Sequence, residues 1–215
     1  MSDSIRDDLQ QGFQLLGLKA DERVITTLVS YLALLKKWNS SFNLSGVSDV
    51  QTMVSRHLLD SLSLNPYLQG KNFLDVGSGA GLPGIPLAIL NPDKHFVLLD
   101  SNGKKTRFLF QAKIELGLDN ISVENCRIEH YQNEQQIDMV MCRAFSTLED
   151  IVNKLEPIFS SNCKLLAMKG LYPEDEIAQL PTSFEVTQTI ELKVPGSDSA
   201  RHVIEVMRKR DLESS

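Results

Sequence analysis

The 215-residue chain is long enough to bury a hydrophobic core without disulfides, and its 42% hydrophobic and 23% charged residues are ordinary for a globular protein. Charged or turn-forming residues interrupt every apolar run and the first residues are acidic, so the sequence predicts a cytoplasmic protein with neither a membrane span nor a secretory signal. Its formal net charge of −6 disfavours a protein that coats nucleic acid, although local basic patches still allow an enzyme that contacts RNA.

The first third of the chain, residues 1–68, is expected to form a helical extension. Its apolar residues recur at helical spacing in three segments, 5–16, 24–35 and 50–64. Asp21 is placed to cap the second helix, and the Asn65-Pro66 pair is a signal that ends the third. Between these two helices the pattern breaks from Trp38 to Leu44.

From Asn72 onward, strand patterns alternate with helical patterns. Strands are expected over Phe73–Val76, His95–Leu99, Ile121–Glu124, Ile137–Cys142 and Cys163–Met168. Helices are expected between them over Ile85–Leu90, Lys104–Leu116 and Leu148–Phe159. This alternation is typical of a parallel sheet that is covered by helices on both faces.

The last part of the sequence is rich in residues that favour strands. The segments Phe184–Val194 and His202–Lys209 flank the loop Pro195–Ala200 and are expected to pair as antiparallel strands at the sheet edge. The predicted fold is therefore α/β and Rossmann-like, with a mainly parallel seven-stranded sheet and an antiparallel edge. We assign it to residues 69–210, followed by a short tail, residues 211–215.

A glycine-rich turn follows the first predicted strand, in the sequence Asp75-Val-Gly-Ser-Gly-Ala-Gly81. Glycines between a strand and a helix let the backbone approach a ligand closely. Asp100, at the end of the second strand, is placed to accept hydrogen bonds from a ribose. A dinucleotide fingerprint would need glycine where Leu82 stands. The Gly-x-Gly-x-Gly spacing instead resembles the signature of class I methyltransferases, which bind S-adenosylmethionine; a ligand-free turn and a nicotinamide enzyme are the alternatives.

Several stretches along residues 30–207 together resemble one family, the 16S ribosomal RNA guanine-N7 methyltransferases, once called glucose-inhibited division protein B. These stretches are Lys37–Asn39, Phe42–Leu44, Arg56–Ser61, Asp75–Pro86, Leu99–Ser101, Lys104–Leu109, Arg127–Glu129, Arg143–Phe145, Lys169–Gly170 and Arg201–His202. The Trp-Asn and Arg-His-x-x-Asp-Ser stretches make the resemblance specific, because glycine loops are shared by many families. One departure is Cys142, where serine is expected.

The resemblance implies binding of S-adenosylmethionine and methylation at N7 of a guanine in the 530 loop, in the decoding region of 16S ribosomal RNA. It places Gly77 and Leu82 on the methionine side of the cofactor. It places Ile128 and Glu129 at the adenine, and Arg143 at the mouth of the site. The predicted cofactor-binding residues are Gly77, Gly79, Leu82, Asp100, Ile128, Glu129 and Arg143. We expect a monomer without a metal that acts on RNA within a small-subunit particle.

Arg143 is the predicted catalytic residue. Guanine N7 has a lone pair and no proton to lose, so it can attack an activated methyl group without a general base, and positioning becomes the enzyme's main task. Arg143 follows the fourth strand, at the carboxyl ends of the strands, where ligands bind in open α/β folds. A surface arginine is the alternative. Phe145 could stack on a base or pack in the core.

The three cysteines, Cys126, Cys142 and Cys163, are odd in number and have no metal-ligand spacing, so buried free thiols are expected. A nucleophilic Cys142, as in carbon-5 pyrimidine methylation, is the alternative. Three basic stretches could contact RNA or simply face solvent: Lys36–Lys37, Lys104–Arg107 and Arg208–Arg210.

Four further polar residues have open roles. Arg56, His57 and Asp60 are expected to share a helix face, either in ion pairs or in the active site, and His202 is expected to be structural. Two rival functions also stay open. One is a small-molecule methyltransferase on the same fold, and the other is a noncatalytic cofactor-binding factor for ribosome assembly.

Overall fold

The computed structural model describes residues 2–132, 135–160 and 162–209. Its centre is a seven-stranded sheet in the order β3-β2-β1-β4-β5-β7-β6. The strands are β1 (Asn72–Val76), β2 (His95–Leu99), β3 (Ile121–Glu124), β4 (Met139–Arg143), β5 (Lys164–Lys169), β6 (Phe184–Glu191) and β7 (His202–Arg208). Strands β1 to β5 are parallel to one another. At one edge of the sheet, β7 runs antiparallel to both of its neighbours, β5 and β6. The predicted fold class is therefore confirmed; the predicted tail, residues 211–215, lies outside the described residues.

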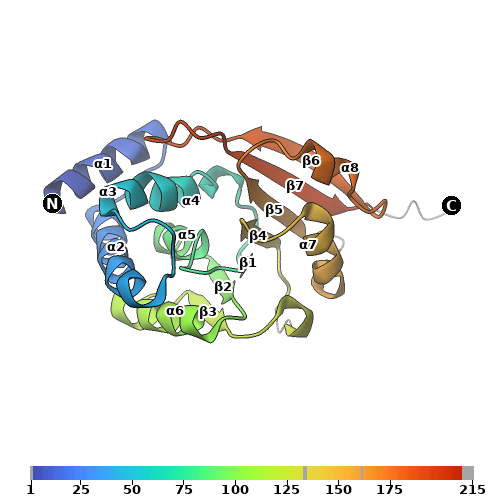
Figure 1. Ribbon diagram of the computed structural model, residues 1–215, viewed down its shortest axis with the longest axis horizontal. Coiled ribbons are helices and arrows are strands. Elements are labelled where there is room, and N and C mark those ends of the chain that lie inside the picture. Colours follow the sequence, from blue (N-terminus) through green and yellow to red (C-terminus); the bar gives the residue numbers. More distant parts are fainter. Residues whose placement is uncertain (1, 133–134, 161, 210–215) are drawn as a thin grey trace.

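Helices cover both faces of this sheet (Figure 1). They are α1 (Ser2–Leu15), α2 (Glu22–Phe42), α3 (Val50–Met53), η1 (Val54–Leu59), α4 (Asp60–Leu62), η2 (Asn65–Tyr67), α5 (Gly84–Leu90), α6 (Gly103–Leu116), η3 (Ile128–His130), α7 (Leu148–Leu155), η4 (Glu156–Ile158) and α8 (Glu174–Ala178). In the part of the chain that the structure describes, no helix is both long and apolar enough to span a membrane.

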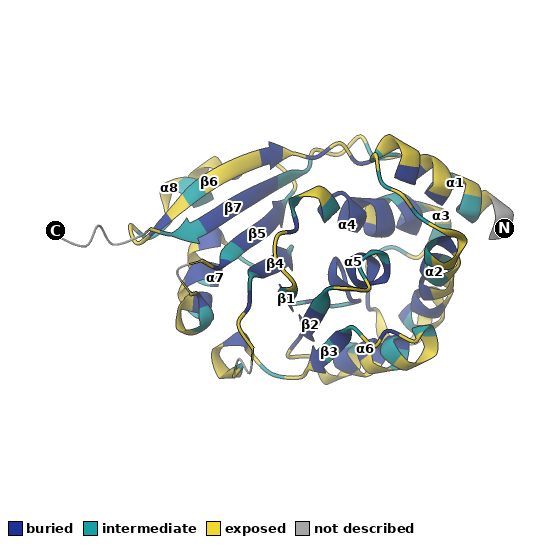
Figure 2. Cartoon of the chain, turned by 180° about the vertical axis from the view of Figure 1, so that it is seen from behind, coloured by how far each residue is buried: buried dark blue, intermediate teal, exposed yellow. Residues whose placement is uncertain are grey.

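Alternate residues of the central strands build two separate layers of core. Phe73 and Met139 belong to the buried cluster that includes α2, α5 and α6, whereas Leu74 and Val140 belong to the cluster that includes α7. Both faces of these strands are apolar because helices cover both. The outer strand β6 is mostly exposed on its outer side (Figure 2).

The N-terminal helices pack into the core of the sheet domain. Leu9 of α1 and Leu28 of α2 are fully buried in the same cluster as Phe73 of β1. The buried Tyr31 hydroxyl of α2 donates a 2.7 Å hydrogen bond to the carbonyl oxygen of Ala80. The helical segment is thereby tied to the glycine-rich turn.

Helix α2 extends beyond its predicted end. The predicted break at Trp38 is wrong, because the helix continues to Phe42 and ends at Asn43, which has a left-handed φ of 49°. Trp38 and Phe42 lie one turn apart and stack with ring centroids 5.2 Å apart. Trp38 also packs edge-on against Phe108 of α6, at 5.8 Å. These ring contacts stabilise helix in a stretch whose polar residues suggested a break.

The third helical segment runs from Val50 to Leu62 and contains a π-helical stretch, η1, in its middle. The wider turns change the side-chain spacing. His57 and Asp60 are buried, whereas Arg56 is exposed. The prediction that all three share one face is therefore wrong for Arg56.

Most other boundaries differ from prediction by one or two residues. The larger differences are at α1, which begins at Ser2, at α7, which gives way after Leu155 to the 3₁₀ turn η4, and at β6, which ends at Glu191. Pro157 lies in that turn, and a proline cannot donate the backbone hydrogen bond that would continue the α-helix. Helix α8 was not predicted, since five residues are too few to show a helical period.

Candidate functional site

The glycine-rich turn connects the carboxyl end of β1 to α5. Gly77, Gly79 and Gly81 have φ values of 70°, 60° and 84°, in the left-handed region that favours glycine. The Gly77 amide donates a 2.8 Å hydrogen bond to the carbonyl oxygen of Leu99, which ties the turn to the end of β2. A Cβ atom at Gly77 would lie 2.4 Å from Cδ2 of Phe145. A side chain at Gly77 would therefore fit only if the Phe145 ring moved.

Asp100 follows β2 and binds the glycine turn directly. Its Oδ2 atom accepts a 2.9 Å hydrogen bond from the Gly79 amide, and its Oδ1 atom accepts a 2.8 Å bond from the Asn102 amide. Lys105 Nζ lies 3.6 Å from Oδ2. A carboxylate oxygen has more than one lone pair, so Asp100 can hold the turn and still accept a hydrogen bond from a ligand hydroxyl.

A cavity of about 350 Å³ lies beside this turn, at the carboxyl ends of β1, β2 and β4. It is lined by Gly77, Leu99, Asp100, Ser101, Lys105, Cys126, Arg127, Ile128, Ala144, Phe145 and Lys154. Three of the seven predicted cofactor-binding residues are among them: Gly77, Asp100 and Ile128. The others lie nearby in the chain but outside this lining: Gly79, Leu82, Glu129 and Arg143.

Two of these four residues occupy contrasting environments. Leu82 is buried, whereas Glu129 is exposed on η3. The predicted adenine contact can therefore come from buried Ile128 and from the backbone of η3, but the Glu129 side chain does not line the cavity.

Phe145 lines the cavity, so its predicted role in the core is wrong, and stacking on a base stays a prediction. Its side chain is 37% exposed, and its ring covers Gly77. Lys154, which also lines the cavity, has its Nζ atom 5.7 Å from the centroid of the Phe145 ring. Ala144, the residue before it, has a left-handed φ of 50°, which is strained for a residue with a Cβ. The turn after β4 is thus shaped to bring Phe145 against the glycine turn.

Asp75 is a fully buried acid beneath the same turn. Its Oδ2 atom accepts a 2.9 Å hydrogen bond from the Gly84 amide, whereas Oδ1 has no hydrogen-bond partner among the described residues. Burial raises the pKa of Asp75 to about 7, although the Gly84 hydrogen bond and the nearby Arg143 guanidinium oppose this shift. An unpaired, buried carboxylate oxygen is costly, so a bound cation or hydrogen-bond donor would be stabilised here.

Arg143 is not a solitary surface arginine. It ends β4, and its Nη1 atom donates hydrogen bonds to Oδ2 of Asp60, at 3.0 Å, and to the carbonyl oxygen of Arg56, at 3.1 Å. Asp60 is 1% exposed, and its Oδ1 atom accepts a 2.7 Å hydrogen bond from Nε of Arg201. One buried carboxylate from the helical segment thus holds two guanidinium groups at the edge of the sheet.

His57, the neighbour of this cluster on η1, is a buried histidine. Its Nε2 atom lies 2.6 Å from Oγ of Ser45, and Nδ1 has no hydrogen-bond partner among the described residues. Burial lowers the pKa of His57, and the Arg143 charge lowers it further. His202 has a backbone contact instead, since its Nδ1 atom lies 2.9 Å from the carbonyl oxygen of Gly170.

The cysteines divide into two kinds. Cys142 and Cys163 are buried, and burial raises the pKa of each to about 12. A thiol of such high pKa is a poor nucleophile at neutral pH, which favours the core role of Cys142. The prediction of a buried thiol is wrong for Cys126, which is half-exposed because the chain leaves β3 after Glu124.

The basic stretches have different surroundings. Lys105 lines the cavity and pairs with Asp100, so it is not a purely solvent-facing residue. Arg208 pairs with Glu156 at the far end of β7, and Arg210 lies outside the described residues. Lys36 and Lys37 line an open groove with polar residues of the 39–48 segment. Within residues 2–132, 135–160 and 162–209, no three His, Cys, Asp or Glu side chains gather as a metal site would require.

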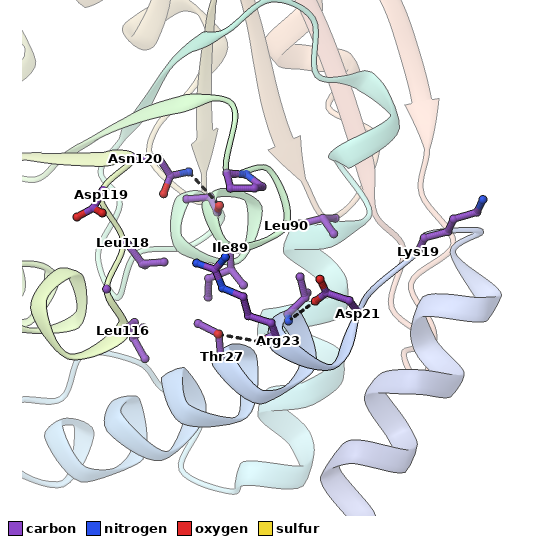
Figure 3. A pocket seen from close by; sticks show the side chains of 14 residues that line it. Lys19, Asp21, Arg23, Thr27, Ile89, Leu90, Leu116, Leu118, Asp119 and Asn120 are labelled. Carbon is purple, nitrogen blue, oxygen red and sulfur yellow. Dashed lines mark hydrogen bonds between the residues drawn. The ribbon is translucent and has the colours of Figure 1, made fainter.

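A second cavity, of about 590 Å³, lies between the start of α2, the end of α5 and the α6–β3 connection (Figure 3). Because that connection leads into the amino end of β3, this cavity lies at the amino ends of the parallel strands, whereas the glycine turn lies at their carboxyl ends. Its rim carries both charges, from Lys19, Arg23 and Asp119. Its Asn120 amide donates to three backbone carbonyl oxygens. It therefore resembles a structural junction rather than a reaction site.

Several site residues escape prediction from the sequence. Arg127 and Lys154 line the cavity, yet neither is among the predicted site residues. The pairing of Asp60 with Arg143 and Arg201 joins residues 83 and 141 positions apart. The sequence signal was the concentration of Arg, His and Asp in the stretches Arg56–Ser61 and Arg201–His202. This pattern did not indicate that side chains of the two stretches contact each other.

Comparisons with known proteins agree on one family. Residues 24–204 match the GidB family model, described as rRNA small subunit methyltransferase G. A protein named ribosomal RNA small subunit methyltransferase G from Nitrosococcus oceani is 49% identical over 209 residues, which are 97% of this chain and 98% of that protein. A protein of the same name from Ectopseudomonas mendocina is 50% identical over 204 residues, 94% and 95% of the two chains.

Solved structures show the same fold at low sequence identity. A magnesium protoporphyrin IX methyltransferase from Synechocystis, solved with bound SAM, matches with a TM-score of 0.58 at 13% identity, over 83% of this chain and 97% of that one. A ribosomal protein L11 methylase from Lactobacillus delbrueckii matches with a TM-score of 0.55 at 15% identity, over 76% and 81% of the two chains.

Proposed function

Because the chain belongs to the GidB family of small-subunit ribosomal RNA methyltransferases, we propose that it transfers a methyl group from S-adenosylmethionine to N7 of a guanine in the 530 loop of 16S ribosomal RNA. The observation that carries this proposal is the cavity at the carboxyl ends of β1, β2 and β4, with its glycine-rich turn and its acid at the end of β2. We also propose that residues 1–68 serve as a helical extension of a catalytic domain, residues 69–210, and that a monomer acts on a small-subunit particle.

The residues present fit S-adenosylmethionine. Asp100 and Ser101 lie where a ribose diol can be bound, and Ile128 offers an apolar contact for an adenine ring. The partnerless Oδ1 atom of buried Asp75 suits the ammonium group of the methionine moiety. When bound, S-adenosylmethionine supplies a methyl group on a positively charged sulfur.

The protein's own contribution is positioning. No residue has to remove a proton, because guanine N7 attacks through a lone pair. Arg143 is held at the end of β4 by Asp60 and the backbone of Arg56, and its charge opposes the rise in the pKa of Asp75 that burial causes. Its fixed pair of donors suits guanine O6, which leaves N7 free to face the methyl group. We assign to Arg143 the orientation of the base and to Phe145 the exclusion of water from the glycine turn.

Cofactor binding is expected to weaken as the pH falls below about 7. The Asp75 pKa is raised to about 7 by burial, and a cationic ammonium group binds the carboxylate and not the neutral acid. Each pH unit below this pKa should therefore raise the dissociation constant about tenfold. Isothermal titration calorimetry between pH 5.5 and 8.5 measures this dependence.

The Asp75→Asn variant should bind weakly and with the same affinity across this range. Asp119→Asn, which alters an exposed aspartate near the amino end of β3, should keep the wild-type profile. A wild-type dissociation constant that does not change with pH would rule out the Asp75–ammonium contact.

The function itself is tested by transfer of a labelled methyl group from S-adenosylmethionine to small-subunit particles that lack the modification. Location of the product at guanine N7 separates the proposal from a small-molecule methyltransferase, which would instead modify a free metabolite.

A further inference from the structure

Beside Arg143, the carboxyl ends of β4 and β5 lie next to the beginning of β7. Arg143 of β4 pairs in register with Met168 of β5, and Lys169 of β5 pairs with His202 of β7. Because β7 is antiparallel, its beginning meets the ends of β4 and β5. The segment after β5 and Arg201, immediately before β7, therefore lie on the same side as the cofactor cavity.

Two guanidinium groups are fixed beside these strand ends by one buried acid. Asp60 bonds Arg143 through Oδ2 and Arg201 through Oδ1, at 3.0 and 2.7 Å. The Arg143 and Arg201 side chains keep 22% and 26% of their surface exposed. A single carboxylate cannot neutralise two arginines, so the cluster of Asp60, Arg143 and Arg201 carries a net positive charge that is held in a defined position.

The segment after β5 presents apolar side chains to solvent. Leu171 is 81% exposed and Tyr172 is 50% exposed. The segment is nevertheless fixed, because His202 contacts the Gly170 carbonyl oxygen at 2.9 Å and the rings of His202 and Tyr172 lie 5.9 Å apart at 69°. Exposed apolar groups on an ordered segment mark a binding surface rather than a loose loop.

We propose that Arg201, Leu171 and Tyr172 form a docking surface for an unpaired nucleotide of the RNA substrate, adjacent to the target guanine. This inference rests on the proposed function. Arg201 supplies a forked donor for the phosphate, and Leu171 and Tyr172 supply a flat apolar surface on which a base stacks.

The division of roles follows from charge. Glu174 and Asp175 begin α8 just after Tyr172, and their carboxylates disfavour a phosphate there. The phosphate is therefore assigned to Arg201 and the base to Leu171 and Tyr172. Arg143, held by the same Asp60, remains the contact of the target guanine, so that the two arginines set the distance between neighbouring nucleotides.

The test is filter binding of unmodified small-subunit particles over a range of KCl concentrations. Tyr172→Ala should weaken binding about 5- to 100-fold, the range that removal of one stacked base contact produces, whereas Tyr172→Phe should bind like the wild type. Arg201→Ala should reduce the slope of log affinity against log salt by about 0.7, and Arg201→Lys should preserve it.

Arg208→Ala is the matched control, because it removes an arginine from the opposite end of β7. It should leave both the affinity and the slope unchanged. Cofactor titration and thermal unfolding establish that each variant is folded. If wild-type protein binds and methylates the particles and the Tyr172 and Arg201 variants bind equally well, the docking surface is wrong and the proposed function stands. If the wild type neither binds nor methylates them, both proposals fail.

Discussion

Replacement of Arg143 by alanine is expected to reduce single-turnover methyl transfer at least about 100-fold, the scale on which a misplaced reactant loses rate. The reason is geometric. Arg143 is anchored by Asp60 and the Arg56 backbone, so its guanidinium presents donors in a fixed direction. A positive charge does not favour the purine cation that forms when N7 is methylated, so the benefit comes from orientation of the base.

The Arg143→Lys variant separates orientation from charge. Lysine keeps the charge but lacks the planar pair of donors, so this variant should be nearly as slow as Arg143→Ala. Rapid-quench measurement with labelled cofactor gives the transfer rate, and calorimetry gives cofactor affinity, which should change much less. Wild-type rates in either variant would exclude the orienting role, and loss of cofactor binding alone would assign Arg143 to the cofactor.

Replacement of Gly77 by valine is expected to weaken cofactor binding at least about 30-fold. The new Cβ would lie 2.4 Å from the Phe145 ring, and the φ of 70° is unfavourable for a β-branched residue. Crowding costs about 1–3 kcal/mol, and so does the backbone strain. Relief requires the turn or the Phe145 ring to move, and both line the cavity, so the loss should appear in cofactor binding.

Gly46→Val is the control for this experiment. Gly46 has no atom within 4 Å of a built Cβ and no left-handed φ, so valine there should leave the cofactor dissociation constant unchanged. Circular dichroism shows whether both variants fold. Wild-type cofactor binding by folded Gly77→Val protein would mean that the glycine turn does not contact the cofactor.

The sheet was the most predictable part of the molecule. The strands at His95–Leu99 and Ile121–Glu124 were predicted at their observed boundaries, because the first is a short apolar run followed by Asp100 and the second alternates apolar and polar residues. The end of α2 was not predictable, since the contact that extends it, Trp38 against Phe108, joins segments far apart in the chain.

The candidate site was predictable only where it is local in sequence. Gly77, Gly79 and Asp100 are recognisable because the turn and the strand end fix their positions. The Asp60 cluster depends on the π-helical stretch of η1, on the order of the strands and on their register, none of which a pattern of residue types reveals. For the same reason Arg143 was located at a strand end without its partners.

The carboxylate of Asp60 binds both Arg143 and Arg201, so a substitution of Asp60 affects both arginines. Loss of Asp60 would take the shared carboxylate from both arginines, whereas loss of either arginine leaves Asp60 one partner, so loss of Asp60 is expected to be more costly. Changes at Asp60 are therefore expected to affect both the orientation of the target guanine and the docking of its neighbour.

Methyl transfer to small-subunit particles that lack the modification is the most direct measurement of what this protein does. Particles are incubated with labelled S-adenosylmethionine, and the RNA is then treated so that the strand is cleaved specifically at N7-methylguanosine. We expect one methyl group per particle, located at a single guanine of the 530 loop. Binding of S-adenosylmethionine with no transfer to particles or to naked ribosomal RNA, or transfer to a free metabolite only, would contradict the proposed function.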